Sequence, residues 1–274
     1  MAIITLTSDI GVQDYLPGAV KGRLLRVNPE FTLVDITHQV PPFNYPQAAY
    51  ICRNAIRNFP EGSYHLVMVN LFDSNPTHLL FALHRNQYII CADNGLLTMI
   101  LEEMPEEVVA VPLPKELKPD TLNIADLVGR QIELLDQGAS LEDIGDPRIA
   151  IREKHPLKPL SGPGWLEGQI IFIDNFENVV VNITREQFEA ERKGRSFKIV
   201  FKRDEVIDRI SSTYADVPES EKLALFNASG YLEIAINKGN AAGLFGLQGF
   251  TARSGNSAVF QSRLFYQTVR IYFE

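Results

Sequence analysis

Two short apolar runs near the start of the sequence are predicted to be strands. Polar residues lie at the end of each of them. The segment SDIG at 8–11 follows AIITLT, and DITH at 35–38 closes the run TLVDIT. Open α/β sheets build ligand crevices at the carboxyl ends of their strands, so both segments are candidates for a binding site. Asp9 suits a ribose diol, with capping of the next helix as the alternative. His38 suits proton transfer near neutral pH, with a structural hydrogen bond as the favoured alternative.

Two more polar segments follow apolar runs further along the chain. NLFDSN at 70–75 comes after HLVMV, and ADNG at 92–95 ends the run QYIICA. Asp-Asn-Gly is also a strong turn signal, so the second segment is explained without any ligand. Each segment is weak evidence when it is taken singly.

The second half of the sequence offers two polar turns. DNFEN at 174–178 separates two apolar runs, and NASGY at 227–231 separates two others. A hairpin turn would explain either segment without any ligand. With NLFDSN and ADNG counted as one site, these segments make five sites in a fixed order, which are harder to dismiss than one.

Generic catalytic and cofactor motifs are absent from the sequence. It has no GxGxxG after a strand, no Walker loop, no GxSxG and no HExxH. Its two cysteines, Cys52 and Cys91, lie in separate apolar runs, which favours buried and inert thiols over a disulfide or a zinc knuckle. The sequence therefore gives no support for nucleotide-phosphate binding by one of these motifs.

The elements that must position the polar segments alternate between strands and helices over residues 1–150. Helices are expected near Tyr15–Val27 and Pro46–Asn58, after Asn94, and over Asn123–Asp136 with a stop at Gly138. Between them lie the strand candidates AIITLTS, TLVDIT, HLVMV, HLLFALH, QYIICA and EEVVAVPL. This rhythm predicts parallel strands with crossover helices, in an α/β fold with an open sheet.

The pattern changes after residue 150. Residues 151–164 are rich in Pro, Lys and Gly without an apolar period, which indicates a linker. Residues 165–274 then hold closely spaced strand candidates: LEGQIIFID, NVVVNI, SFKIVF, KLALFN, YLEIAI and FYQTVRIYF. We predict a smaller, β-rich carboxy-terminal domain.

Length and composition agree with two globular domains. The chain has 274 residues, of which 45% are hydrophobic and 22% charged. Its formal net charge of -8 opposes nucleic acid as a partner, because Lys and Arg supply most of that affinity. No apolar run approaches the roughly 20 residues of a membrane helix, and MAIITLTS does not read as a signal peptide. We expect a cytoplasmic protein that binds no membrane.

Taken together, the polar segments resemble a known family. SDIGVQDYLPGAVKG, VDITHQVPP, ADNGLL, IDNFENVVVNI and FNASGYLEIAINKGNAA are similar, in order and spacing, to the signature segments of the S-adenosylmethionine (SAM) hydroxide adenosyltransferases and the related fluorinases and chlorinases. In that family, water or a halide attacks the ribose C5' of SAM and displaces methionine. The protein mainly positions and desolvates the nucleophile.

The resemblance implies an amino-terminal α/β domain, a carboxy-terminal β-barrel-like domain, and a SAM site without a metal. It also implies a homotrimer whose ligand sites lie between one subunit's first domain and a neighbour's second. Asp9 would bind the ribose hydroxyls, and Asp174 and Asn178 the methionine amine and the adenine edge. Asn227 and Ala228 would face the methionine end.

The sequence departs from the family pattern at several positions. Ile10, Glu177 and Ala228 replace the usual Phe or Leu, Gly and Ser. The family's water-activating Asp, Arg and His align with Asn70, Thr77 and Asn123, of which the last is aligned through TLNIAD. Asn cannot accept a proton from water at neutral pH, and loss of a general base costs about a hundredfold to ten-thousandfold in rate.

Three functions remain open at this point. The first is hydrolysis of SAM to adenosine and L-methionine, with Asp73 and His78 as a substitute dyad suggested by their proximity in sequence. For that pair the alternative is two solvated loop residues. The second function is a non-catalytic binder or sensor of SAM or adenosine. The third is an enzyme that acts on another adenosyl substrate.

Overall fold

The computed structural model describes residues 2–73, 75–114, 120–202, 205–247 and 267–274. The chain divides into two compact units, residues 1–156 and 157–274, and each is described by itself. The division falls inside the segment 151–164 that the sequence indicates as a linker. Residues 151–156 belong to the first unit, where Ile151 packs against a cluster of buried apolar side chains.

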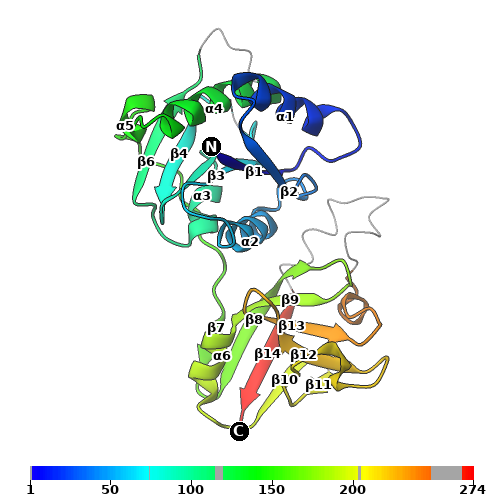
Figure 1. The fold of residues 1–274 in the computed structure, drawn as a ribbon. Helices are drawn as coiled ribbons and strands as arrows, with labels where there is room; N and C mark the ends of the chain where they lie inside the picture. The colour runs from blue at the N-terminus through cyan, green and yellow to red at the C-terminus, as the bar shows by residue number, and fades with distance from the viewer. Residues whose placement is uncertain (1, 74, 115–119, 203–204, 248–266) are drawn as a thin grey trace. The chain divides into compact units, whose positions relative to one another are not determined.

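The first unit is an open six-stranded sheet with helices on both faces, as predicted (Figure 1). The strand order is β2-β1-β3-β5-β4-β6. The strands are β1 (Ile3–Ser8), β2 (Thr32–Thr37), β3 (Tyr64–Met68), β4 (His78–His84), β5 (Gln87–Ala92) and β6 (Glu107–Pro112). The helices are α1 (Leu16–Val27), α2 (Tyr45–Ile56), α3 (Leu96–Leu101), α4 (Thr121–Asp136) and the short α5 (Leu141–Ile144).

Only part of this sheet is parallel. Strands β1, β2, β3 and β5 run parallel, whereas β4 is antiparallel to both β5 and β6. The reversal is a two-residue hairpin in which Arg85 and Asn86 both have left-handed backbones, with φ of 50° and 57°. Such turns match the twist of paired strands. The hairpin places the start of β4 beside the carboxyl end of β5.

The strands alternate their side chains between two cores. Leu66 and Met68 face the core that α1 and α4 cover, and Val67 and Val69 face the core that α2 and α3 cover. This alternation explains why β3 reads as an unbroken apolar run, because both of its faces are buried.

Both cysteines are free and buried in the core of α2 and α3, as expected. Burial raises the pKa of the Cys52 thiol to about 12 and also raises that of Cys91. A thiol held in its neutral form is a poor nucleophile, so both act as packing groups.

The second unit is a nearly closed, barrel-like antiparallel sheet. Its strand order is β11-β10-β14-β8-β9-β13-β12, with β7 paired to β8. An isolated β-bridge between Ile210, which follows β11, and Ala224 on β12 joins the two ends of this strand order. The strands are β7 (Leu160–Gly162), β8 (Trp165–Ile173), β9 (Val179–Thr184), β10 (Phe197–Lys202), β11 (Glu205–Ile207), β12 (Lys222–Phe226), β13 (Tyr231–Ile236) and β14 (Thr268–Phe273). The β-rich domain was predicted, although the first residues of FYQTVRIYF lie outside the described ones.

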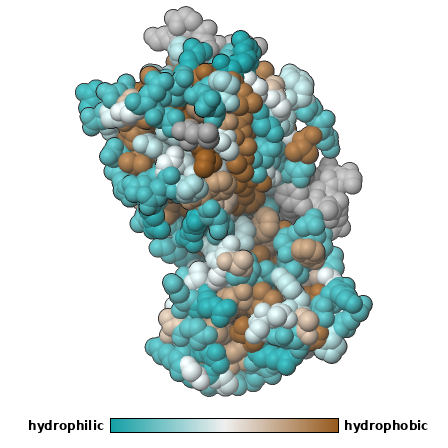
Figure 2. All heavy atoms as spheres, viewed as in Figure 1, coloured by the Kyte–Doolittle hydropathy of each residue, from teal (hydrophilic) through white to brown (hydrophobic). Residues whose placement is uncertain are grey.

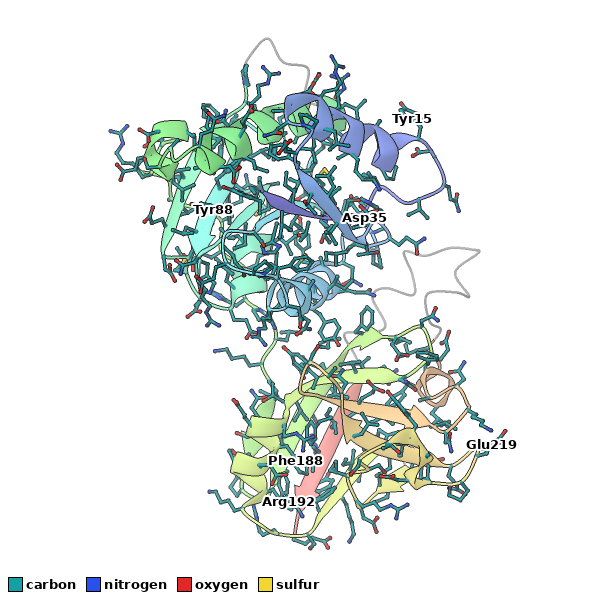
Figure 3. The ribbon with its side chains drawn as sticks, in the orientation of Figure 1. Tyr15, Asp35, Tyr88, Phe188, Arg192 and Glu219 are labelled. Carbon is teal, nitrogen blue, oxygen red and sulfur yellow. The ribbon has the colours of Figure 1, made fainter. Side chains whose placement is uncertain are left out.

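Helix α6 (Arg185–Arg192) was not predicted from the sequence. It begins with a capping box in which the Thr184 side chain accepts from Gln187 N–H and the Gln187 side chain accepts from Thr184 N–H. Phe188, which is labelled in Figure 3, anchors the helix. Its ring packs edge-on against those of Phe197 and Phe226. On the faces seen in Figure 2, hydrophilic side chains predominate around smaller apolar patches. No helix in the described parts of the chain is long and apolar enough to cross a membrane.

The core of the first unit contains a histidine that makes folding sensitive to acid. His65 on β3 is buried beside Thr5, whose hydroxyl lies 2.8 Å from His65 Nδ1. Burial lowers the pKa of His65 from 6.5 to about 4. Between pH 6.5 and about 4, His65 is therefore protonated in the unfolded chain but neutral in the folded chain.

We expect the free energy of unfolding to fall as the pH drops from 6.5 towards 4, with His65 contributing about 3 kcal/mol of that loss. Urea denaturation of wild type and His65→Gln at pH 7 and pH 4.5 measures it. The variant should start less stable and lose less on acidification. His155→Gln, at an exposed position, is the matched control and should follow wild type. An equally steep loss in His65→Gln would contradict the assignment.

Candidate functional site

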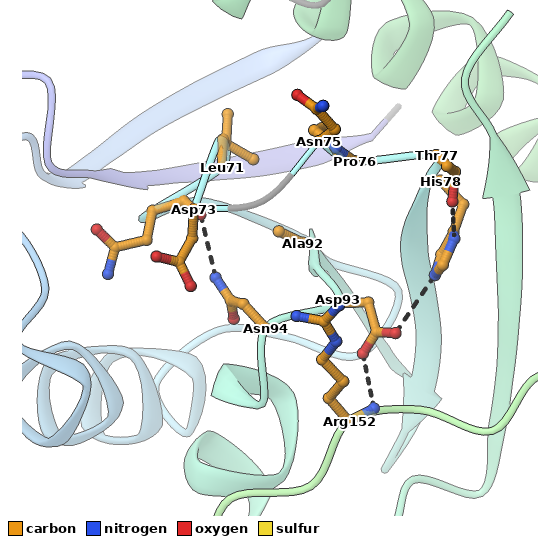
Figure 4. A pocket seen from close by; sticks show the side chains of 11 residues that line it. Leu71, Asp73, Asn75, Pro76, Thr77, His78, Ala92, Asp93, Asn94 and Arg152 are labelled. Carbon is orange, nitrogen blue, oxygen red and sulfur yellow. Dashed lines mark hydrogen bonds and ion pairs between the residues drawn. The ribbon is translucent and has the colours of Figure 1, made fainter.

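A small polar cavity lies at the carboxyl edge of the first unit's sheet (Figure 4). It measures about 50 Å³, which is room for a few water molecules. The loop after β3, the start of β4, the turn after β5 and the segment near Arg152 form it. The lining residues are Asn70, Leu71, Asp73, Asn75, Pro76, Thr77, His78, Ala92, Asp93, Asn94 and Arg152.

Asp9 connects the end of β1 to this cavity. Its Oδ2 accepts a hydrogen bond from the backbone N–H of Asn70 at 2.9 Å. Burial raises the pKa of the Asp9 carboxyl, and the Asn70 N–H acts in the opposite direction. The alternative role as a helix cap is wrong, because α1 begins after Tyr15 without any side-chain cap. Asp9 is free to present its other carboxylate oxygen to a ligand.

Asn70 is held in an unusual conformation at the end of β3. Its backbone is left-handed, with φ of 50°, and its side chain is only 7% exposed. Asn70 Oδ1 accepts from Phe43 N–H at 3.1 Å, which leaves Nδ2 buried and without a hydrogen-bond partner. A buried unpaired donor beside a cavity indicates a missing acceptor, such as a bound water or a ligand oxygen.

Asn94 ties the end of β5 to the same loop. Its Nδ2 donates to the carbonyls of Val69 and Asn70, at 3.1 and 3.3 Å. Its Oδ1 accepts from Leu96 N–H at the start of α3, after Gly95 turns the chain with φ of 89°. The turn signal in the sequence was real, and it also carries this positioning role.

The structure gives Asp73 and His78 different partners. Tyr45 Oη donates to Asp73 Oδ2 at 3.3 Å, whereas His78 Nε2 lies 3.4 Å from Asp93 Oδ2. Both side chains line the cavity, but no bond joins them. Sequence reasoning had singled out the ADNG segment at a strand end without giving Asp93 a role, and had placed Arg152 in a linker.

Asn70, Thr77 and Asn123, which the resemblance aligns with the family's water-activating residues, do not all line the cavity. Asn70 and Thr77 line the cavity, and Thr77 Oγ1 lies 3.0 Å from His78 Nδ1. Asn123 instead lies in the first turn of α4, where its Nδ2 donates to Asp120 Oδ2. It is not among the residues that line this cavity.

His38 takes the structural role that the sequence favours. It is buried, with Nδ1 2.7 Å from Ser8 Oγ and Nε2 3.1 Å from Asp35 Oδ1. These contacts join the ends of β1 and β2. His38 thus braces the loop that carries Asp9.

The turn after β8 is organised by Asp174. Its Oδ1 accepts from the backbone N–H groups of Phe176 and Asn178, and Asn178 Nδ2 donates to its Oδ2 at 3.0 Å. Glu177 has a left-handed backbone with φ of 62°, the conformation for which Gly is favoured. The hairpin interpretation therefore holds here, because this turn joins the antiparallel strands β8 and β9.

The turn after β12 is likewise organised by a side chain that accepts hydrogen bonds from backbone N–H groups of the same turn. Asn227 Oδ1 accepts from the backbone N–H groups of Ser229 and Tyr231, and Ala228 lies between them in the chain. The buried Glu233 on β13 receives a hydrogen bond from Tyr214 Oη at 2.7 Å. Burial raises the pKa of Glu233, and the nearby Asp174 acts in the same direction. Sequence reasoning missed this buried carboxyl group, because Glu233 lies among apolar residues in the segment YLEIAI.

In the part of the chain that the structure describes, no group of three or more His, Cys, Asp or Glu side chains is arranged to hold a metal ion.

Comparison with protein families decides what the two units are. Residues 4–145 match the model of the SAM hydroxide adenosyltransferase N-terminal domain, and residues 168–252 match that of the C-terminal domain. The chain belongs to the SAM hydroxide adenosyltransferase family.

Relatives of this chain carry two different names. A protein of Methanocaldococcus jannaschii named (R)-S-adenosyl-L-methionine hydrolase is 26% identical, over 88% of this chain and 91% of its own length. A protein of the same name from Thermus thermophilus is 27% identical, over 90% and 97%. A fluorinase of Actinopolyspora mzabensis is 25% identical, over 88% and 92%. The chain is thus similar along most of its length to members of a SAM-processing family.

Solved structures support the fold. A conserved protein of Thermotoga maritima superposes with a TM-score of 0.79 at 24% identity, and the match covers 99% of this chain and all of that one. One from Thermus thermophilus gives a TM-score of 0.71 at 22% identity. Both proteins therefore share the fold of this chain.

The departure from the family's Gly at position 177 has a measurable cost. A left-handed backbone costs a residue with a side chain about 1 kcal/mol more than Gly. We expect Glu177→Gly to raise the free energy of unfolding by about this amount, measured by urea denaturation.

The matched control is the reverse change in the other turn. Gly230 has φ of 79° and open space where a Cβ would stand, so Gly230→Ala should cost about 1 kcal/mol through the backbone alone. Destabilisation in both variants would mean that the Glu177 side chain contributes more than its backbone loses.

Proposed function

We propose that this protein hydrolyses SAM, with water attacking the ribose C5' to give adenosine and L-methionine. The observation that carries the proposal is the cavity of about 50 Å³ beside Asn70, whose buried Nδ2 has no partner. A donor in that position suits the oxygen of a water molecule. Asp9, bonded to the same residue, suits the ribose of an adenosyl group.

The chemistry makes modest demands on the protein. The sulfonium of SAM is already a good leaving group, so the site must hold water in line with the C5'–S bond and exclude bulk solvent. A proton acceptor helps as the water oxygen forms its new bond. The carboxylates of Asp9, Asp73 and Asp93 also favour a cationic substrate.

The second unit supplies the remaining contacts in this proposal. Asp174 and Asn178 hold the methionine amine and the adenine edge, and Asn227 and Ala228 face the methionine end. The protein assembles as a homotrimer, so these groups come from a neighbouring subunit. Sedimentation equilibrium of the purified protein measures the oligomeric state.

A second candidate function is binding of SAM or adenosine without turnover. The observation that favours it is the replacement of the family's Asp, Arg and His by Asn70, Thr77 and Asn123. Action on another adenosyl substrate is the third candidate. Halide transfer is disfavoured, because the Asp73 carboxylate lines the cavity and would repel the anion.

Incubation with SAM separates these candidates. We expect adenosine and methionine to appear in equal amounts by chromatography, and adenosine to bind in a calorimetric titration. Adenosine binding without release of adenosine from SAM would support the binder. Absence of both would overturn the proposal.

The ribose role of Asp9 can be tested with a matched pair of variants. Asp9→Asn keeps an acceptor for Asn70 N–H but removes the charge, so adenosine affinity should fall about tenfold to a hundredfold. Asp14→Asn also keeps an acceptor for a backbone N–H, that of Leu16, in an exposed part of the same loop. It should bind adenosine like wild type. Equal affinities in both variants would remove Asp9 from the site.

Asn70→Asp restores the family's carboxylate without losing a hydrogen bond. Its Oδ1 keeps the Phe43 N–H, and the unpartnered Nδ2 becomes an oxygen. We expect adenosine release to accelerate at least tenfold, since a proton acceptor is gained. Asn75→Asp, on the rim of the same cavity, is the control for added charge alone. Equal acceleration in both would assign the gain to charge.

A further inference from the structure

The cavity contains a histidine and a carboxylate that the family pattern does not assign. We propose that His78 accepts the proton of the attacking water and that Asp93 positions His78 for this step. The inference rests on the proposed hydrolysis of SAM. It replaces the pairing of His78 with Asp73 by the pairing that the structure contains.

The sheet register brings the two side chains together. In the antiparallel pair of β4 and β5, Leu79 lies opposite Ala92, so His78 and Asp93 are the next opposing pair. His78 is the first residue of β4, and Asp93 follows the last residue of β5. Both stand at the edge of the sheet where β1 and β3 present Asp9 and Asn70.

Each atom of the pair is held in place. Asp93 Oδ1 accepts from the backbone N–H of Arg152 at 2.8 Å, which leaves Oδ2 at 3.4 Å from His78 Nε2, along a dashed line in Figure 4. The carboxylate favours the tautomer that carries its proton on Nε2. His78 Nδ1 lies 3.0 Å from Thr77 Oγ1, where it can accept the hydroxyl proton.

The other cavity residues suit this step less well. Asn70 presents an N–H donor, which can hold a water oxygen but cannot take its proton. Asp73 already accepts from Tyr45 Oη. Thr77 lines the same cavity as Asn70, so its hydroxyl can connect a water molecule held there to His78 Nδ1.

The step balances without any further reagent. The water oxygen forms a bond to C5' as the C5'–S bond breaks, and the bonding pair leaves with sulfur to give neutral methionine thioether. The water proton moves to Thr77 Oγ1 as the Thr77 hydroxyl proton moves to His78 Nδ1. Asp93 supplies the counter-charge of the imidazolium, which then releases its proton to solvent.

His78→Ala tests the proposal, with added imidazole as the second arm. We expect kcat for adenosine release to fall about a hundredfold to ten-thousandfold, with adenosine affinity unchanged. Free imidazole can enter the space that the side chain vacates, so it should restore part of the rate. Asn70→Asp in the His78→Ala background should also restore part of it, because a carboxylate then faces the water.

His84→Ala is the matched control. His84 lies on the same strand, also beside a carboxylate, with Nε2 3.3 Å from Glu103 Oε1, but at the opposite edge of the sheet. Its rate should equal that of wild type with and without imidazole.

Asp93 is tested by its dependence on His78. Asp93→Asn keeps an acceptor for Arg152 N–H, and we expect it to lower kcat at least tenfold alone but to cost nothing further in His78→Ala. Additive losses would assign Asp93 a separate structural role and overturn the pairing.

The outcomes distinguish the inference from the proposed function. If wild type releases adenosine and His78→Ala keeps its rate, the inference fails while hydrolysis stands. If His78→Ala loses both activity and adenosine affinity and imidazole restores neither, His78 is structural and the inference also fails. If wild type binds adenosine but never releases it from SAM, hydrolysis fails and the inference fails with it.

Discussion

The site depends on a few hydrogen bonds that tie together the carboxyl ends of three parallel strands. Asp9 at the end of β1 accepts from the Asn70 backbone after β3, and Asn94 after β5 donates to the carbonyls of Val69 and Asn70. These bonds hold Asn70 in a left-handed backbone, which for a non-glycine residue persists only where the surroundings impose it. Strain at this point is a reason to look for function there.

Much of the fold could be predicted from the sequence, because each unit's pattern is consistent with its burial. The continuous apolar run of β3 reflects two covered faces, and the closely spaced strands of the second half reflect a barrel. The reversal of β4 was missed, because periodicity does not encode strand direction. Its signal was Arg85-Asn86, a pair without Gly that nonetheless forms a left-handed turn.

Candidate residues could be picked out from the sequence where a polar side chain also shapes the local backbone. Asp9, Asn70 and Asp174 were singled out because polar residues after apolar runs stand out, and Asp174 proves to organise its own turn. Arg152 and Asp93 were not assigned to the site, because they are 59 residues apart in the sequence. A hydrogen bond from the Arg152 backbone N–H to the Asp93 side chain joins them in the structure. Glu233 was hidden because a buried carboxyl group within an apolar strand looks like an ordinary surface position of that strand.

The geometry of a sheet edge explains how charged groups can change position in a family while the site persists. Every strand end and the turn after it converges on the same edge, so an imidazole can reach the cavity from the start of β4 as readily as from another element. A catalytic arrangement is defined by the geometry and roles of its groups rather than by their places in the sequence. The family's acidic and basic positions are neutral amides and a hydroxyl here, yet carboxylate, imidazole and guanidinium groups all line the cavity. Substitution of an aligned residue is therefore weak evidence for loss of activity, unless the cavity around it has also lost the functional group.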